Sequence, residues 1–198
     1  MLTLLPQDLR NRYFAMRHGR SEANAAGIVI SDPKQGTVGY GLCEEGRLQV
    51  RDAVHQHRAL LANCRVVSSD FLRARETAEL VCQLLGLKHP LKQDVRLRER
   101  YFGIHEGCSD RIYPSVWDLD CENPEHEEGG VESAAAVQRR VAGVIQSLEQ
   151  DWVDQDFLLV AHGDPLQMLQ TAFAGVSARH HRGQPHLETA GVRELVRG

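Results

Sequence analysis

The stretch FAMRHGRSEAN, residues 14–24, runs from a short apolar segment directly into the tetrapeptide RHGR. The apolar and aromatic residues that end at this glycine-containing segment predict a β-strand over residues 12–16. A histidine flanked by positive charges is a poor general base, and it does not suit an apolar core. We therefore interpret His18 as a functional residue that follows the end of a strand.

The stretch LLVAHGD, residues 158–164, repeats this pattern of an apolar run followed by His-Gly. Its apolar residues predict a buried strand over residues 157–161, and a helix follows over residues 165–174. In open α/β sheets, ligands bind beyond the carboxyl ends of the strands. His18 and His162 are therefore expected to face the same crevice.

Strand and helix patterns alternate along the rest of the chain, which indicates a layered α/β fold. The further predicted elements are a helix over 44–62, a strand over 65–68, a helix over 70–85 with Asp70 near its N-cap, a helix over 131–150 and a closing strand over 187–196. Two segments interrupt the alternation: the glycine-rich residues 27–43 predict a long functional loop, and the acidic residues 107–130 predict a lid-like excursion. The sequence has no internal repeat or interdomain linker, so we expect residues 1–198 to form one domain.

Two more polar clusters follow predicted strands or begin predicted helices. Arg73 lies in the first turn of the helix over 70–85, where a guanidinium and a helix start both favour phosphate oxygens. Glu99 lies in LRERYFGIHEG, just before a glycine turn. Each residue taken singly has an ordinary structural interpretation. The five in chain order (Arg17, His18, Arg73, Glu99, His162) indicate a site for an anion.

These motifs resemble those of the histidine phosphatase superfamily, whose members have the phosphoglycerate mutase-like fold. Arg17-His18-Gly19 is similar to the family signature, and Ser21 and Asn24 fit its RHGxSxxN extension. YGLCEEGRLQV resembles LTxxGxxQA, SSDFLRARETA resembles SSxLxRAxxTA, LRERYFGIHEG resembles LxExxFGxxEG, and LVAHGDPL resembles the second histidine motif. The five matches come in family order and cover nearly the whole chain. They imply a three-layer α/β/α fold with a central, mostly parallel sheet.

The resemblance implies a role for each residue of the site. His18 would be the nucleophile that becomes a phosphohistidine, and Glu99 would donate a proton to the leaving alcohol. Arg17, Arg73 and His162 would complete the catalytic set, with no metal and no cofactor because the arginines neutralise charge. The residues implied in substrate binding are Arg17, Ser21, Asn24, Arg73, Gly163 and Arg20.

Elementary electrostatics supports these roles. His18 must be neutral to attack phosphorus, and neighbouring positive charges lower a histidine pKa below its usual value of about 6.5. A phosphate dianion beside Glu99 would raise the pKa of its carboxyl toward neutrality, as a general acid in a cell requires.

Three positions depart from the family pattern. Arg20 stands where relatives often carry Glu or Gln, and it either binds a second anionic group or forms an ion pair with Glu22. His105 replaces an aromatic residue that is frequent in the acid motif. Thr189 stands where many relatives have Asn, so we assign it no binding role.

Composition narrows the classes of partner and location. The formal net charge of −4 gives no broad basic surface for nucleic acid or an anionic membrane. No apolar run approaches the ~20 residues of a membrane helix, and the first residues do not resemble a secretory signal. Five scattered cysteines without a C-x-x-C indicate reduced thiols and a cytoplasmic protein. We expect a small phosphorylated metabolite as partner, and a homodimer remains open.

Other chemistries fit the sequence less well. No cysteine has an arginine six residues later, so the cysteine-phosphatase signature is absent, and the Asp-x-Asp of VWDLDC follows no strong apolar strand. The histidines of HQH, 55–57, and HH, 180–181, lack the carboxylates and spacing of a metal site. Within the family, the alternative to a phosphatase is a cofactor-dependent phosphoglycerate mutase, but mutases carry a longer insertion after the acid motif. A non-catalytic phospho-ligand-binding scaffold is the other alternative, although such relatives typically lose the nucleophile or the acid.

Overall fold

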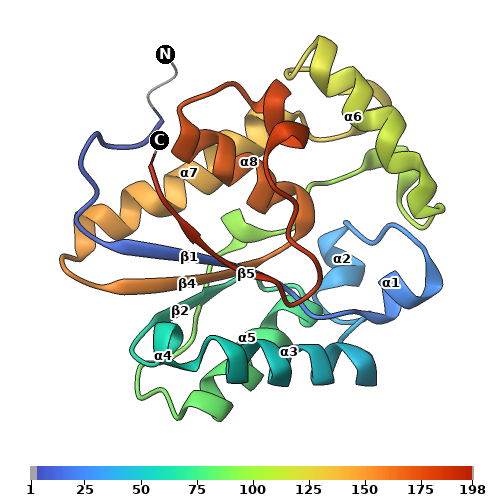
Figure 1. Ribbon diagram of the computed structural model, residues 1–198. Helices are drawn as coiled ribbons and strands as arrows, with labels where there is room; N and C mark the ends of the chain where they lie inside the picture. Colours follow the sequence, from blue (N-terminus) through green and yellow to red (C-terminus); the bar gives the residue numbers. More distant parts are fainter. Residues whose placement is uncertain (1–3, 198) are drawn as a thin grey trace.

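The centre of the protein is a five-stranded sheet in the order β3-β2-β4-β1-β5. The computed structural model describes residues 4–197, and Figure 1 shows the sheet in its middle layer. Strands β1 to β4 run parallel, and β5 pairs antiparallel with β1. The strands are β1 (Arg12–Arg17), β2 (Arg65–Ser68), β3 (Lys92–Gln93), β4 (Asp156–Ala161) and β5 (Val192–Leu195). The predicted α/β fold with a mostly parallel sheet is confirmed.

Helices cover both faces of this sheet, because successive strand side chains point to opposite faces. Tyr13 and Ala15 of β1 pack in one apolar cluster with α7 (Ala134–Asp151) and α8 (Gly163–Ala174). Phe14 and Met16 pack in a second cluster with α3 (Glu44–Gln56) and α5 (Leu72–Leu85). Figure 1 shows α7 and α8 above the sheet and α3 and α5 below it. These are the three layers that the family resemblance implied.

Several predicted boundaries need correction. The predicted helix over 44–62 is two helices, α3 and α4 (Arg58–Leu61), which meet at His57. The helix that follows β2 begins at Leu72 and not at residue 70. Asp70 lies directly before the N-cap residue Phe71, near the N-cap as predicted, and its carboxylate accepts hydrogen bonds from the Arg98 guanidinium. The closing strand β5 is shorter than the predicted 187–196 because it pairs with β1 only over four residues.

The two segments that interrupt the alternation contain short helices. Residues 27–43 follow α1 (Glu22–Ala26) and include α2 (Pro33–Gly36), so the predicted loop is not wholly irregular. Residues 107–130 include α6 (Tyr113–Glu122), which the sequence analysis did not predict. The 3₁₀ turns are η1 (Val95–Leu97), η2 (Gly103–His105), η3 (Asp110–Ile112), η4 (Glu128–Gly130) and η5 (Ala178–Gly183).

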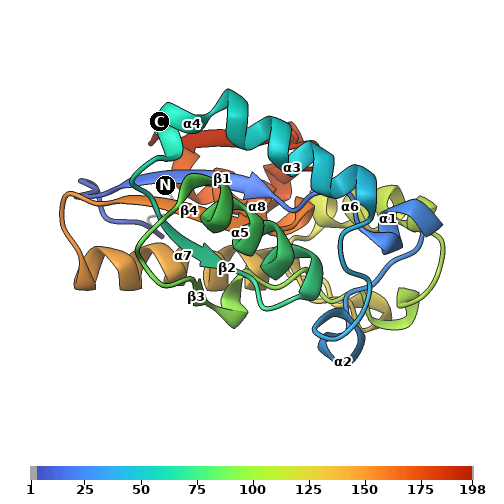
Figure 2. The same cartoon turned by 90° about the horizontal axis from the view of Figure 1, so that it is seen from below.

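These two segments contact each other at one end of the sheet. The backbone N–H of Val29 donates to the carbonyl of Cys108, and Ile28 forms a bridge with Ser109. Val29 also packs with Phe102 and Val116 in a small apolar cluster that is separate from the two sheet faces. Figure 2 shows α1, α2 and α6 gathered beyond the carboxyl end of β1. They therefore stand where an α/β sheet binds its ligands.

Candidate active site

Two histidines meet at the carboxyl ends of the central strands. His18 directly follows β1 and His162 directly follows β4, and the two strands pair in register up to Arg17 and Ala161. Their ring centroids lie 5.1 Å apart, and the residues are 2 % and 0 % exposed respectively. The structure thus brings together the two His-Gly stretches that the sequence analysis expected to share a crevice.

The hydrogen bonds of His18 define its tautomer. Its Nδ1 lies 2.8 Å from the carbonyl oxygen of Gly19, which can only accept, so Nδ1 carries the proton. Its Nε2 therefore holds the lone pair and accepts a hydrogen bond of 3.2 Å from Nε of Arg73. Burial, followed by the charges of Arg73 and Arg17, lowers the pKa of His18 well below its usual value. His18 is consequently a neutral imidazole with its nucleophilic nitrogen beside a guanidinium.

Two arginines that line one cavity carry unpartnered donors. Arg73, in the first turn of α5, donates from Nη2 to the carbonyl of Ile30, and its buried Nη1 has no partner among residues 4–197. Arg17, at the end of β1, donates from Nη1 to the Leu187 carbonyl and to Nε2 of His186. The buried Nε of Arg17 also has no partner in the described chain. Buried donors without acceptors are costly, so these atoms suit an anionic ligand.

Glu99 and His162 lie side by side at this site. Oε2 of Glu99 is 3.9 Å from Nδ1 of His162, and Nε2 of His162 hydrogen-bonds with the Ser69 hydroxyl. Burial and the charge of Asp164 raise the pKa of Glu99 to about 7, although Arg73 and Arg17 oppose this. Burial and the positive charge of the neighbouring Arg73 lower the pKa of His162 well below its usual value. At neutral pH the site can therefore hold a protonated carboxyl beside two neutral imidazoles.

Arg17, His18, Arg73 and Glu99 line a cavity of about 210 Å³, whereas His162 is buried and is not among its lining residues. Its lining includes Arg17, His18, Ser21, Asn24, Arg73, Glu99, Tyr113 and His186. A smaller cavity of about 70 Å³ adjoins it, lined by Arg17, Glu99, Phe102, Tyr113, Trp117, Gly163, Asp164, Arg182 and His186. Because Arg17, Glu99, Tyr113 and His186 line both, the two spaces meet at the proposed acid.

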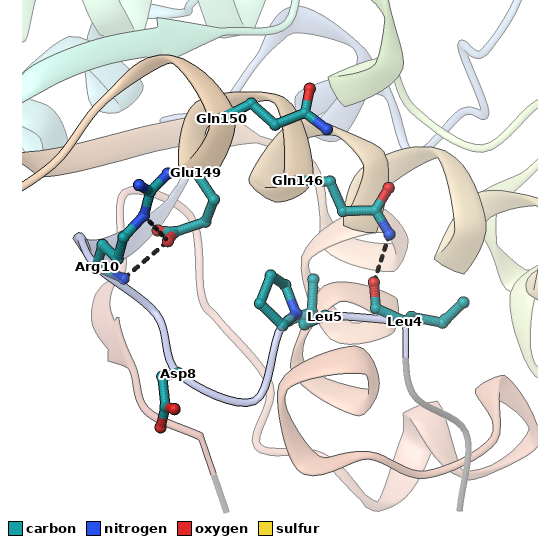
Figure 3. A pocket seen from close by; sticks show the side chains of 8 residues that line it. Leu4, Leu5, Asp8, Arg10, Gln146, Glu149 and Gln150 are labelled. Atoms are coloured by element: carbon teal, nitrogen blue, oxygen red, sulfur yellow. Dashed lines mark hydrogen bonds and ion pairs between the residues drawn. The ribbon is translucent and has the colours of Figure 1, made fainter.

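A larger surface cavity lies elsewhere and has different chemistry. It measures about 470 Å³ and is lined by Leu4, Leu5, Pro6, Asp8 and Arg10 of the amino-terminal segment and by the end of α7. Figure 3 shows the Gln146 side chain donating to the carbonyl of Leu4, and the backbone N–H and Nε of Arg10 facing the Glu149 carboxylate. Arg10 lies just before β1, at the opposite end of that strand from His18. This cavity contains no histidine and is not part of the site.

The family model for the histidine phosphatase superfamily (branch 1) matches residues 13–197. The chain belongs to the histidine phosphatase superfamily. This assignment confirms the resemblance that the five motifs carry.

Similar histidine phosphatases are found among curated proteins and solved structures. The adenosylcobalamin/alpha-ribazole phosphatase of Salmonella typhimurium (strain LT2) is 31 % identical over 165 residues, which cover 80 % of this chain and 77 % of that protein. A mycobacterial glucosyl-3-phosphoglycerate phosphatase in complex with VO3 has a TM-score of 0.75 at 25 % identity, covering 92 % of this chain and 91 % of that one. YhfR of Bacillus stearothermophilus has a TM-score of 0.76 at 25 % identity, covering 93 % and 90 %. The two relatives with named activities are phosphatases, which supports a phosphatase, and hence a hydrolase, for this chain.

Of four further residues predicted to bind substrate in this histidine phosphatase, Ser21, Asn24 and Gly163 line a cavity and Arg20 does not. Ser21 caps α1 and forms a reciprocal capping box with Asn24, and both residues line the larger cavity. Gly163 begins α8 against Arg17, where an added Cβ would lie 3.7 Å from the guanidinium carbon. Arg20 does not line either cavity. Its side chain forms an ion pair with Glu45 at 3.4 Å, and not with Glu22 as one alternative expected.

The cavity-lining residues that the sequence did not predict include Tyr113, Trp117, Asp164, Arg182 and His186. Tyr113 and Trp117 belong to α6, and their rings stack with centroids 5.5 Å apart. The Arg182 guanidinium lies 3.7 Å from the centroid of the Trp117 ring. Asp164 was visible in the quoted HGD, but no local pattern distinguishes it from an ordinary acidic residue in a first helical turn.

Residues 4–197 contain no group of three or more His, Cys, Asp or Glu side chains arranged to hold a metal ion. In the same part of the chain, no helix combines the length and the apolar character needed to cross a membrane.

Proposed function

We propose that this protein is a metal-independent phosphomonoesterase that hydrolyses a small phosphorylated metabolite through a phosphohistidine on His18. The observation that carries the proposal is the tautomer of His18, whose Nδ1 donates to Gly19 and whose Nε2 lone pair adjoins Arg73. The relatives named as alpha-ribazole and glucosyl-3-phosphoglycerate phosphatases support a phosphate ester of a small organic alcohol as substrate.

The first step transfers the phosphoryl group to the protein. Nε2 of His18 forms a bond to phosphorus, the bond from phosphorus to the ester oxygen breaks, and Glu99 gives its proton to that oxygen. The Arg73 donor that faces Nε2 in the free protein turns to a phosphoryl oxygen, and the unpartnered Nε–H of Arg17 donates to a second phosphoryl oxygen. The arginines thereby offset the charge on the transferring group, so a metal ion is not needed.

The second step returns the protein to its starting state. The Glu99 carboxylate takes a proton from water, the water oxygen bonds to phosphorus, and the bond from phosphorus to Nε2 breaks. Inorganic phosphate leaves with the arginines again unpartnered. A carboxyl whose pKa is about 7 can both give and take this proton near neutral pH.

The test compares wild type with His18→Ala on p-nitrophenyl phosphate and a panel of phosphorylated metabolites. We expect wild type to release phosphate, His18→Ala to be inactive, and denatured wild type to carry an acid-labile phosphate label after mixing with substrate. Equal activity of the two proteins would overturn the proposal. Transfer of phosphate to another hydroxyl of 3-phosphoglycerate, without free phosphate, would identify a mutase. Phosphate binding without turnover on any substrate would identify a scaffold.

A further inference from the structure

Asp164 is a buried carboxylate that the steps above do not use. It occupies the first turn of α8, two residues after His162, and is 6 % exposed. The first turn of a helix favours negative charge because its backbone N–H groups point toward the terminus. Asp164 also lines the smaller cavity together with Glu99. It therefore stands beside the proposed acid without belonging to the phosphate cavity.

The contacts of Asp164 come from two other parts of the chain. The indole Nε1 of Trp117, on α6, donates to both of its carboxylate oxygens at 3.1 Å. Nη1 of Arg100 lies 3.5 Å from Oδ2 of Asp164. Hydrogen bonds to an ionised acceptor are about twice as strong as neutral ones, so this environment suits a carboxylate more than an amide. Arg100 directly follows Glu99, and its backbone N–H donates to Oε1 of Glu99 at 2.9 Å.

Charged and titratable groups face Glu99 from several parts of the chain. They are Asp164 of α8, Arg73 of α5, Arg17 of β1, Tyr113 of α6, His162 at the end of β4, and Arg182 of η5 and His186, which line the smaller cavity with Glu99. Arg73 and Arg17 favour the ionised form of Glu99, while His162 is neutral. Asp164 is the acidic side chain in this set, so its charge opposes the ionisation that the arginines promote.

We propose that Asp164 is a positioning residue that keeps the proton on Glu99 until the leaving group needs it, while Trp117 holds α6 against the same carboxylate. The inference rests on the proposed function and deepens it. Burial raises the pKa of Glu99 and the two arginines lower it, so the charge of Asp164 adds to the effect of burial. Asp164 counters the arginines without touching the substrate phosphate, which the arginines still bind.

Asp164 acts on the pKa of Glu99 in the step that transfers the phosphoryl group to His18. As the bond from phosphorus to the ester oxygen breaks, the proton leaves Oε of Glu99 and forms the O–H of the alcohol, so Glu99 becomes a carboxylate. Asp164 neither gives nor receives this proton. Its charge makes the carboxylate product less favourable in the free protein, and burial and Asp164 together raise the pKa of Glu99 to about 7. Loss of that charge would lower the pKa of Glu99.

The experiment measures kcat/KM against pH for Asp164→Asn with two matched substrates. Phenyl phosphate has a poor leaving group that requires a proton, whereas p-nitrophenyl phosphate has a good leaving group that does not. We expect the alkaline limb for phenyl phosphate to move about one pH unit toward lower pH in the variant. The profile for p-nitrophenyl phosphate should keep its position. Asparagine still accepts from the Trp117 indole, so the fold is retained.

Two control variants separate the effect of the Asp164 charge from the effect of its hydrogen bond with Trp117. Asp118→Asn removes an exposed charge from α6 and should leave both profiles in place. Trp117→Phe removes the indole donor but keeps the Asp164 charge, so it should alter KM and leave the alkaline limb unmoved. An unmoved limb in Asp164→Asn, or an equal shift on both substrates, would overturn the inference. Failure of wild type to hydrolyse either substrate would instead count against the proposed function.

Discussion

Nε of Arg73 donates a hydrogen bond of 3.2 Å to Nε2 of His18, so the proposed nucleophilic atom is already paired in the free protein. The same guanidinium holds the Ile30 carbonyl through Nη2 and leaves Nη1 unpartnered among residues 4–197. An incoming phosphate oxygen can take over the Nε donor and thereby release the lone pair for attack. Arg73 thus adds to the effect of burial in lowering the pKa of His18 before binding, and it offers donors to the phosphate afterwards.

Arg73→Gln should weaken activity and change its dependence on pH. Removal of the guanidinium should lower kcat/KM for p-nitrophenyl phosphate by about 10²–10³-fold. The pKa of His18 is lowered by burial and then by Arg73 and Arg17. Without Arg73 the pKa of His18 rises, so the acid limb of the profile moves toward higher pH. Arg75→Gln is the matched control, because Arg75 lies on the same helix and pairs with the exposed Glu79. An acid limb that stays in place would contradict the role of Arg73.

Glu99→Gln should discriminate between leaving groups. The amide cannot give a proton to the ester oxygen, so kcat/KM for phenyl phosphate should fall by about 10²–10⁴-fold. The loss on p-nitrophenyl phosphate should be much smaller, because this leaving group departs without a proton. Glu79→Gln, a surface change on α5, should affect neither substrate. If both substrates lose activity equally in Glu99→Gln, the residue acts by shape or charge and not as the proton donor.

The central part of the site could be predicted because it follows from strand ends. Strand patterns precede both His18 and His162, so the two histidines meet if these strands are neighbours in the sheet. The strands are neighbours, and Arg17 pairs with Ala161 in their register. Parallel strands then carry both histidines to one edge of the sheet. Arg73 follows by the same logic, since its helix begins just beyond β2.

The surroundings of Glu99 could not be predicted because they depend on contacts between distant residues. The inward face of α6 carries Val116 and the buried Asp120, so the helix lacks a continuous apolar stripe. Asp120 is compensated by Arg100, 20 residues earlier, and by His181, 61 residues later. Trp117 likewise reaches Asp164 over 47 residues. No local pattern in a single sequence reports such pairs.

The partner of the Arg20 side chain could not be predicted from its sequence neighbours. Its place within the first motif suggested either a second anion or Glu22 as its partner, and the structure pairs it with Glu45 of α3. The backbone N–H of Arg20 donates to the Gln49 side chain, which ties the residue to that helix. Position in a motif therefore did not decide which way the side chain points.

Asp120→Asn should destabilise the protein strongly. Asp120 and Arg100 are both 0 % exposed and share two hydrogen bonds of 2.7 Å. Leaving the buried guanidinium without its full charge partner should lower the free energy of unfolding by about 3–5 kcal/mol, measured by urea denaturation at pH 7. Glu125→Gln breaks the exposed pair with Arg139 and should cost about 1 kcal/mol or less. Similar losses in the two variants would contradict this account.

The cost of Asp120→Asn should also depend on pH. Burial alone would raise the pKa of Asp120, but hydrogen bonds from His181 and Arg100 outweigh it and lower the pKa to about 2. A carboxyl whose pKa is lower in the folded state contributes stability above its unfolded pKa of about 3.9. That contribution is lost as the pH falls toward 2. The difference in unfolding free energy between wild type and Asp120→Asn should therefore shrink as the pH falls below about 4. A difference that persists unchanged to pH 2 would show that packing, and not charge, carries the effect.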